Sequence, residues 1–385
     1  MQQRSRRQFL STLSHGLAIS AFGMQGIVTF SSCASEEKKE AKLEEKAASN
    51  AAKNANKLGI ALVGLGKYSS GQLGPALRET EKCYLAGIVT GTPSKIPEWK
   101  EKYKIPEKNV YNYENFDSIR DNPDIDIIYI VLPNAMHAEY VVRAAEAGKH
   151  VICEKPMAIT VAECDRMIAA CKKAGKKLSI GYRLHFEPHN IEMMRLTREK
   201  VYGNVKKVFA NDGMAEVEGW RLNKELAGGG PLMDVGIYCV QGARYVTGME
   251  PIAVIAQEGN KTKPEMFTNI EESLTWQMEF PGGLIADCKT SYTEDMNLLR
   301  AEADKGWYEL SPAYAYRGID GRTSDGRMNF PEVYQQARQM DDFADCIINN
   351  RETPVPGEMG RQDVKILQAI YESMKTGKRV AISKS

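Results

Sequence analysis

Residues 58–69 read Leu58-Gly59-Ile60-Ala61-Leu62-Val63-Gly64-Leu65-Gly66-Lys67-Tyr68-Ser69. The apolar run at the start is typical of a buried parallel strand, and the glycines follow it in the spacing G-x-G-x-x-S. The first glycine of this spacing permits a tight turn, and the second lets the backbone approach a pyrophosphate. The start of the following helix then faces the phosphates. The stretch predicts a dinucleotide-binding turn, although a plain glycine turn could carry the same letters.

Further apolar runs predict the rest of the fold. They occupy residues 84–89, 126–132, 150–153 and 177–180, and residues 137–148 between two of them have helical spacing. Strands that alternate with helices indicate a parallel, doubly wound sheet. From about residue 250, polar and apolar residues alternate instead, as in 273–280, which is typical of an antiparallel sheet with one covered face. We therefore predict an α/β chain with a Rossmann domain over 58–181 and an α+β domain with an open, mostly antiparallel sheet over 182–385.

The cofactor is expected to be NADP rather than NAD. An NAD site usually has Asp or Glu after the second strand, where it binds the ribose 2′-hydroxyl. This chain has Thr90-Gly91-Thr92-Pro93-Ser94-Lys95 there, which offers hydroxyls and an amine to a 2′-phosphate and no carboxylate to repel it. Binding of NAD remains open, and Lys95 could also be a solvated surface lysine.

The N-terminus is expected to be an export signal. Ser5-Arg6-Arg7-Gln8-Phe9-Leu10 has a twin-arginine pattern, and no charged residue follows Arg7 until Glu36. We assign 1–33 to a twin-arginine signal, which predicts a periplasmic protein exported in the folded state. Phe30-Ser31-Ser32-Cys33 is similar to a lipoprotein cleavage box, so a lipid anchor on Cys33 and simple cleavage both stay open. Residues 34–57 are rich in Ala, Lys and Glu and are interpreted as a charged linker.

Composition excludes several classes of protein. The chain of 385 residues is too long for one small domain, and its 51 basic and 50 acidic residues argue against a nucleic-acid-binding protein. Arg4, Arg6 and Arg7 lie in the signal, which has no acid, so its removal changes the net charge from +1 to −2. The cysteines after Cys33 lie in apolar surroundings and are expected to be packing residues rather than a disulfide framework. The histidines are scattered, and no metal site is expected.

Three residues are candidates for chemistry. Lys155, in Glu154-Lys155-Pro156, follows the strand 150–153, at the sheet edge where ligands bind in such folds. Asp234 and Tyr238 are four residues apart, so they would share one helix face after a flexible entry at Gly228-Gly229-Gly230. A carboxylate and a phenol on one face could position a sugar and handle a hydroxyl proton. The alternative is a helix N-terminal Asp with a packed Tyr.

With these residues in place, the sequence resembles the Gfo/Idh/MocA oxidoreductase family, and within it the branch of periplasmic glucose–fructose oxidoreductases. The resemblance covers nearly all of the chain after residue 58. It rests on these segments: GLGKYS at 64–69, YIVLPNAMHAEY at 129–140, AGKHVICEKPMA at 147–158, IGYRLHFEP at 180–188, WRLNKELAGGGPLMDVGIY at 220–238 and INNRETPVPGEMGRQDVKILQAIYE at 348–372.

The resemblance implies roles for individual residues. Tyr238 would donate and accept the proton, Lys155 would lower the pKa of Tyr238 and polarise the sugar oxygen, and Asp234 would orient the sugar. The residues expected to bind the cofactor are Gly64, Gly66, Lys67, Tyr68, Thr90, Gly91, Thr92, Lys95, Tyr113, Leu132, Pro133, Asn134, His137, Glu154, Lys155, Arg183, Trp220 and Arg221. Those expected to bind the substrate are Lys155, Tyr182, Arg183, Asp234 and Tyr238. The Lys155–Pro156 bond is expected to be cis, and Tyr113 could instead be a packed loop aromatic.

The function that follows is an exported, NADP-dependent sugar oxidoreductase. It would move a hydride between a sugar and a tightly bound nicotinamide cofactor. The alternatives are an NAD-dependent glycoside-cleaving relative of the same superfamily and a sugar-binding protein without turnover. The expected partners are small sugars and a second copy of the chain, as a homodimer or homotetramer. The protein is expected to contact a membrane only through the signal or a lipid anchor on Cys33.

Overall fold

The computed structural model describes residues 56–383. The signal, Cys33 and nearly all of the linker predicted above therefore lie outside the described residues. Within that range, none of the helices is both long and apolar enough for a membrane span. No three His, Cys, Asp or Glu side chains of residues 56–383 come together as a metal site.

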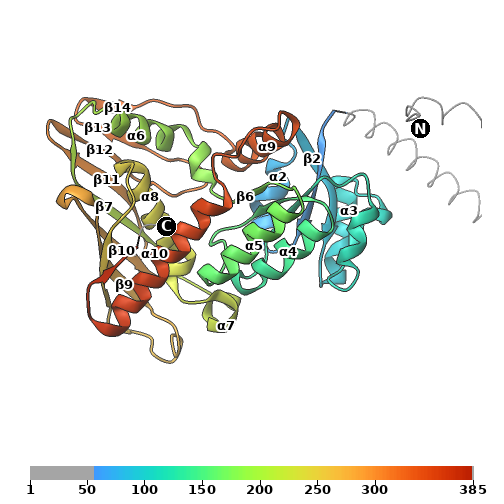
Figure 1. Cartoon of the computed structure of the whole chain (residues 1–385), viewed down its shortest axis with the longest axis horizontal. Helices are drawn as coiled ribbons and strands as arrows, with labels where there is room; N and C mark the ends of the chain where they lie inside the picture. Colours follow the sequence, from blue (N-terminus) through green and yellow to red (C-terminus); the bar gives the residue numbers. More distant parts are fainter. Residues whose placement is uncertain (1–55, 384–385) are drawn as a thin grey trace, which may run out of the picture. The chain divides into compact units, whose positions relative to one another are not determined.

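The first sheet has six parallel strands in the order β3-β2-β1-β4-β5-β6 (Figure 1). The strands are β1 (Leu58–Val63), β2 (Cys83–Val89), β3 (Val110–Tyr111), β4 (Ile127–Ile130), β5 (His150–Cys153) and β6 (Leu178–Ile180). The helices between them are α2 (Gly74–Ala76), α3 (Ile96–Tyr103), α4 (His137–Glu146) and α5 (Val161–Lys173). This order confirms the predicted Rossmann sheet and places the ends of β1 and β4 side by side, where such folds bind dinucleotides.

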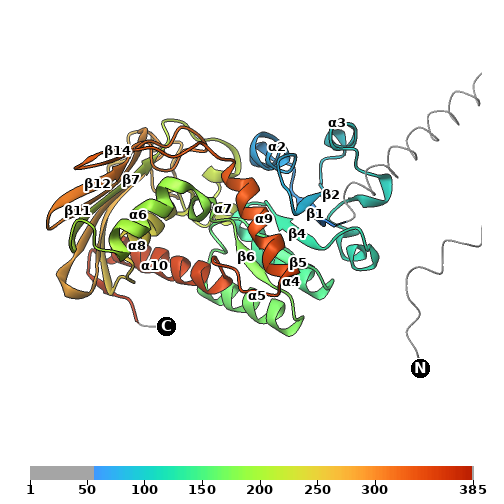
Figure 2. The same ribbon diagram turned by 90° about the horizontal axis from the view of Figure 1, so that it is seen from above.

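A helix from the far end of the chain completes this domain. Helix α9 (Gln335–Ile348) follows the predicted second domain in sequence, yet its apolar residues pack with those of β1 and β4. Met340 and Phe343 of α9 share a core with Ile60 and Leu62 of β1. Figure 2 shows α9 across one face of the sheet, with α4 and α5 on the other. The boundary predicted between residues 181 and 182 therefore does not describe where α9 packs.

The second sheet is mixed and mostly antiparallel, as predicted. Its order is β14-β13-β12-β11-β7-β10-β9-β8-β15, and only β7 and β10 pair in parallel. The strands are β7 (Val205–Gly213), β8 (Ala253–Glu258), β9 (Ser273–Glu279), β10 (Ile285–Ser291), β11 (Met296–Ala303), β12 (Gly306–Leu310), β13 (Gly321–Thr323), β14 (Gly326–Met328) and β15 (Val380–Ala381). Helices α6 (Pro188–Arg198), α8 (Ile237–Thr247) and α10 (Gly357–Thr376) lie against one face, and no helix of residues 56–383 lies on the other (Figures 1 and 2). The short α7 (Lys224–Ala227) precedes α8.

The three glycines before α8 are packed, which corrects the expected flexible entry. A Cβ on Gly229 would lie 1.9 Å from the Tyr371 hydroxyl, and one on Gly230 would lie 2.4 Å from the Glu271 main-chain oxygen. The Glu271 carboxylate in turn accepts hydrogen bonds from the main-chain amides of Gly230 and Leu232. These residues are glycine because neighbouring groups leave no room for a side chain. The contacts hold the start of the helical segment that carries Asp234 and Tyr238.

The seven cysteines of the described chain are buried and free. Cys153, Cys164 and Cys171 belong to the core between the first sheet and its helices. Their burial agrees with the expectation that these cysteines are packing residues.

Candidate functional site

The glycine turn after β1 is tight on its inner side and open on its outer side. Gly64 has φ +95°, and a Cβ there would lie 2.4 Å from the Val131 main-chain oxygen, whereas a Cβ on Gly66 would have no neighbour within 4 Å. The buried Ser69 hydroxyl donates to the Gly64 oxygen at 2.6 Å and closes the turn from within. The backbone at Gly66 is therefore accessible to a ligand, as a pyrophosphate cradle requires.

Two lysines flank this turn. Lys95 donates from Nζ to the Leu65 main-chain oxygen at 2.7 Å, so its amine lies against the turn. The side chain of Lys67 is 92% exposed and forms an ion pair with Glu218. At the end of β2, the main-chain amide of Thr92 donates to the Thr90 hydroxyl at 3.0 Å. This edge presents hydroxyls and amines, and its composition fits a 2′-phosphate.

The ring of Tyr113 lies against Gly91. A Cβ on Gly91 would approach Cε2 of Tyr113 to 2.7 Å, so only glycine allows this contact. Tyr140 meets the ring of Tyr113 edge-on, with the ring centroids 5.4 Å apart, and Arg143 donates to the Tyr113 main-chain oxygen at 3.1 Å. Tyr113 is thus a fixed aromatic wall beside the end of β2.

Three of the predicted ligand residues use their polar atoms within the protein. The His137 ring is buried, and its two nitrogens lie 2.8 Å from the Leu132 oxygen and 2.9 Å from the Pro156 oxygen. Asn134 donates to the Ala227 oxygen at 2.8 Å. The Tyr182 hydroxyl donates to Asp363 of α10 at 2.6 Å.

These hydrogen bonds leave the polar side-chain atoms of Asn134, His137 and Tyr182 bonded within the protein. The His137 ring joins the loops after β4 and β5, and the Asn134 side chain joins the loop after β4 to the end of α7. The Tyr182 hydroxyl is bonded to the Asp363 carboxylate in the core, whereas the resemblance implied that Tyr182 binds substrate.

Lys155 is where the candidate catalytic residues meet. Its Nζ donates to the Asp234 main-chain oxygen at 2.6 Å and lies 3.8 Å from Oδ1 of the same residue. The same Nζ lies 4.5 Å from the centroid of the Tyr238 ring. The Lys155–Pro156 peptide bond is cis, as the resemblance implied. The structure thus brings Lys155 together with Asp234 and Tyr238, although Lys155 and Tyr238 are 83 positions apart in sequence.

Glu154 lies beneath Lys155 in the interior. Its carboxylate accepts a hydrogen bond from the Tyr129 hydroxyl at 2.6 Å, and that hydroxyl also accepts from Gln339 of α9 at 3.0 Å. Burial raises the pKa of Glu154, while its contacts with Tyr129 and Lys155 act in the opposite direction. Helix α9 therefore supports the loop that carries Lys155.

The two carboxylate oxygens of Asp234 have different partners: Oδ2 is hydrogen-bonded within the protein, and Oδ1 faces Lys155. Its Oδ2 accepts hydrogen bonds from Nε of Arg221 at 2.6 Å and from the Tyr292 hydroxyl at 3.2 Å. Burial alone would raise the pKa of Asp234, but the charges of Lys155 and Arg221 outweigh it and hold this pKa below its usual value. Asp234 is therefore a carboxylate at neutral pH. The guanidinium of Arg221 also lies over the Trp220 ring, 4.9 Å from its centroid.

Tyr238 is a buried phenol whose main cationic neighbour is Arg183. Burial raises the pKa of Tyr238 to about 12, and Arg183 is the largest influence in the opposite direction. The resemblance implied that Lys155 lowers this pKa, but the charge of Arg183 is the main lowering influence, although both cations lie over the ring of Tyr238. At neutral pH Tyr238 therefore carries its proton. Tyr68 joins the same region through Tyr316, with ring centroids 5.7 Å apart.

Several residues of the site were missed by sequence reasoning. Asp212 of β7 is only 5% exposed, and burial raises its pKa well above the usual value, although Lys155 and Arg183 oppose this. Tyr292 holds Asp234, and Tyr314 stacks on Tyr238 with centroids 5.9 Å apart. Asp212 had a detectable signal, because it occupies an inward position of a strand whose other inward residues, such as Val208 and Ala210, are apolar.

Two family models match the chain. The model described as the oxidoreductase family with an NAD-binding Rossmann fold matches residues 58–182. The model of the GFO/IDH/MocA C-terminal domain matches residues 191–308.

Individual relatives are sugar dehydrogenases and oxidoreductases. The chain is 28% identical over 344 residues to D-xylose 1-dehydrogenase [NADP(+)] of Haloarcula marismortui, covering 85% of this chain and 94% of the relative. It is 27% identical over 281 residues to D-glucoside 3-dehydrogenase of Escherichia coli, covering 67% and 79%. The crystal structure of aldose-aldose oxidoreductase from Caulobacter crescentus, complexed with glycerol, aligns with a TM-score of 0.82 and 44% identity, covering 84% of this chain and 99% of that chain.

Proposed function

The chain belongs to the Gfo/Idh/MocA oxidoreductase family, and we propose that it is an exported, NADP-dependent sugar oxidoreductase. The observation that carries the proposal is the junction at Lys155. Its amine contacts both Asp234 and Tyr238, at the same edge of the parallel sheet as the glycine turn. An ammonium, a carboxylate and a phenol in one buried place can bind a sugar hydroxyl and exchange its proton.

The protein's own residues would act on the oxygen of the sugar. The bound nicotinamide supplies or accepts the hydride at the neighbouring carbon. In the reducing direction Tyr238, as a phenol, donates its proton to the carbonyl oxygen, and in the oxidising direction the phenolate takes the hydroxyl proton. Lys155 donates a hydrogen bond to that oxygen, and Oδ1 of Asp234 accepts one from a neighbouring sugar hydroxyl.

The preference for NADP rests on the edge after β2. Thr90, Thr92 and Lys95 offer hydroxyls and an amine, and residues 90–95 include no carboxylate that would repel a phosphate. Tyr113 would cover the adenosine end of the cofactor. Titration calorimetry of cofactor-free protein tests this point, and equal affinities for NADP and NAD would contradict it.

Export suggests that the cofactor stays bound between turnovers. The twin-arginine pattern implies folding before export, and free NADP is scarce in the periplasm. A retained cofactor could oxidise one sugar and be restored by reducing another. The similarity to an aldose-aldose oxidoreductase supports this form of the proposal.

The experiment is purification from the periplasm without added cofactor, followed by nicotinamide absorbance and fluorescence of the protein. Mixing with an aldose should change the fluorescence, and a second aldose or ketose should restore it. Protein that is purified without bound cofactor and is active only with added NADP would exclude the proposal that the cofactor stays bound between turnovers. Release of nitrophenol from a nitrophenyl glycoside without net oxidation would instead favour the glycoside-cleaving alternative.

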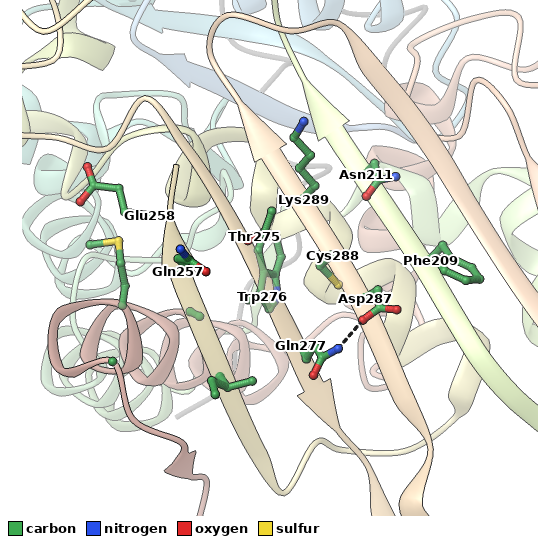
Figure 3. Close-up of a pocket in the computed structure, with 14 residues that line it drawn as sticks. Phe209, Asn211, Gln257, Glu258, Thr275, Trp276, Gln277, Asp287, Cys288 and Lys289 are labelled. Carbon is green, nitrogen blue, oxygen red and sulfur yellow. Dashed lines mark hydrogen bonds between the residues drawn. The ribbon is translucent and has the colours of Figure 1, made fainter. Parts of the chain in front are cut away.

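The uncovered face of the second sheet supports an assembly of two copies. A shallow groove of about 770 Å³ crosses β7, β8, β9 and β10 (Figure 3). Its floor combines the half-buried Phe209 and the exposed Ile255 with Gln277, which donates to Asp287 at 2.7 Å. Asp287 also forms an ion pair with Lys207 at 2.8 Å, and a face with apolar side chains and polar groups that are paired with one another is suited to another protein surface.

Light scattering tests this part of the proposal. Ile255→Glu should shift the protein toward the monomer, because it buries an unpaired charge in the interface. Ile191→Glu on α6 is a matched control, because Ile191 is 46% exposed and lies away from this face. Equal masses for both variants and the unaltered protein would exclude the face as the interface.

A further inference from the structure

Arg183 is a buried cation without a carboxylate partner in the described chain. It is 2% exposed, and no ion pair of residues 56–383 includes it. Its NH2 donates to the Tyr314 oxygen at 2.6 Å and its NH1 to the Ala315 oxygen at 3.1 Å, while Gln335 of α9 also accepts from NH1. Its Nε has no hydrogen-bond partner in the described part of the chain. Burying a charge without a carboxylate partner is unfavourable, so stability alone does not explain an arginine at this position.

The guanidinium lies between two tyrosine rings. Its central carbon is 5.1 Å from the centroid of the Tyr238 ring and 4.4 Å from that of Tyr316. Neutral main-chain and amide oxygens hold the group in place without cancelling its charge. The positive field of Arg183 is therefore directed at the phenol that the proposed function uses for proton transfer.

Other charged and titratable groups also lie around Tyr238. They are Lys155 and Glu154 after β5, Asp212 on β7, Tyr68 after the glycine turn, Tyr245 on α8, Tyr316, and Tyr314, which stacks on the ring. Glu154 and Asp212 raise the pKa of Tyr238, while Arg183 has the largest lowering influence. Arg183 thus opposes burial and the two carboxyl groups in part, and the pKa of Tyr238 stays above its usual value.

We propose that Arg183 is a positioning residue for proton transfer, whose uncompensated charge stabilises the phenolate that Tyr238 becomes when it gives up its proton. The inference rests on the proposed function. In the reducing direction the Tyr238 proton moves to the sugar carbonyl oxygen as the hydride arrives at carbon, which leaves a phenolate. In the oxidising direction this phenolate takes the hydroxyl proton as the hydride leaves. Arg183 keeps its own protons throughout, and its charge and its side-chain interaction with Tyr238 both favour the phenolate.

Gln335 allows this charge to be cancelled in place. Gln335→Glu puts a carboxylate against NH1 of Arg183 without changing the size of the side chain. The matched control is Gln335→Met, which also loses the amide hydrogen bonds to the oxygens of Ala315 and Tyr316 at 3.1 and 3.2 Å but adds no charge. Single-turnover oxidation of the bound sugar by the holoenzyme is measured as a function of pH for both variants.

The pH midpoint of Gln335→Glu should lie above that of Gln335→Met by about one pH unit or more. At a pH below both midpoints, a difference of about one pH unit between them makes the reaction of Gln335→Glu about tenfold slower than that of Gln335→Met. Identical midpoints for the two variants would overturn the inference. Should Gln335→Glu fail to fold, Arg183→Lys and Arg183→Met make the same comparison, with the higher midpoint expected only for Arg183→Met.

A second readout does not depend on turnover. The near-ultraviolet phenolate absorbance is titrated for each Gln335 variant and for the same variant carrying Tyr238→Phe, and the difference reports Tyr238. A higher midpoint in the Glu variant supports the role of Arg183 even if no sugar is oxidised, in which case the proposed function alone fails. An active wild type with equal Tyr238 midpoints in both variants refutes only the role of Arg183.

Discussion

Replacing Lys155 by Met should nearly abolish hydride transfer while leaving the fold and the cofactor site in place. Methionine keeps most of the side-chain volume but removes the Nζ that donates to the Asp234 oxygen at 2.6 Å and lies 4.5 Å from the Tyr238 ring centroid. Both contacts come from one atom, so one substitution removes the whole junction. The glycine turn and the edge after β2 contain neither contact and should bind cofactor as before.

The magnitude follows from what the ammonium does. Loss of one preorganised donor to a reacting oxygen slows catalysis by about 10²–10³-fold, equivalent to about 2.7–4 kcal/mol. The lost hydrogen bond from a charged donor destabilises the fold by about 1.5–3 kcal/mol, and relief from burying the ammonium offsets part of that loss. We therefore expect a large fall in rate with a small fall in stability.

The assay is stopped-flow fluorescence of the holoenzyme mixed with excess aldose, with cofactor affinity measured separately by titration. Lys149→Met is the matched control, because Lys149 is also buried and donates from Nζ to the Asn122 oxygen at 2.8 Å, before β5 rather than after it. It should lose comparable stability and keep its rate. A Lys155→Met rate within about threefold of wild type, which is under 1 kcal/mol, would refute the assignment of Lys155 to the chemistry.

Three further predictions concern other parts of the site. Lys95→Ala should weaken the binding of NADP by about tenfold and that of NAD much less, because a charged hydrogen bond to phosphate contributes about 1.5–3 kcal/mol. Calorimetry measures both affinities, and equal losses would place Lys95 away from the 2′-phosphate. Tyr182→Phe should lower the free energy of unfolding by about 1.5–3 kcal/mol, because the hydrogen bond to Asp363 is lost. The values of kcat and KM should stay unchanged, and a raised KM would show that Tyr182 binds substrate. Burial raises the folded-state pKa of Glu271, so wild type should lose stability relative to Glu271→Gln as pH rises from about 4.3 through that raised pKa; parallel Tm curves across this range would contradict it.

Local sequence was sufficient for the first sheet and for a short list of candidate residues at the site. The run 58–63 and the glycines that follow it predict strand, turn and cofactor edge, because period, length and turn chemistry act over a few residues. Lys155 is a candidate because it follows a buried strand, whereas the spacing of Asp234 and Tyr238 leaves a packed Tyr as an alternative and the family resemblance implies their roles. Even here the local geometry differs, since Asp234 lies in a π-helical turn, Leu232–Gly236, and α8 begins only at Ile237.

Long-range packing accounts for the residues that were missed or misjudged. The contact of Arg183 with Gln335 spans 152 positions, and that of Tyr182 with Asp363 spans 181. No local pattern shows that Tyr182 points into the core while its neighbour Arg183 lies against Tyr238. Helix α9 has an apolar face in the sequence, but β1 and β4, against which it packs, lie more than 200 residues earlier in the chain.

The sequence by itself determined the Rossmann sheet, the glycine turn and the lack of a carboxylate after β2, because each depends on neighbours in the chain. It also offered Lys155, Asp234 and Tyr238 as candidates, whose roles the family resemblance implied. Only the tertiary structure decided which groups set the charge around them. Arg183 rather than Lys155 is the main cation acting on Tyr238, Tyr182 is a brace, and Asp212 is part of the site. Charge, burial and hydrogen bonding act through space, and the distances that govern them exist only once the chain is folded.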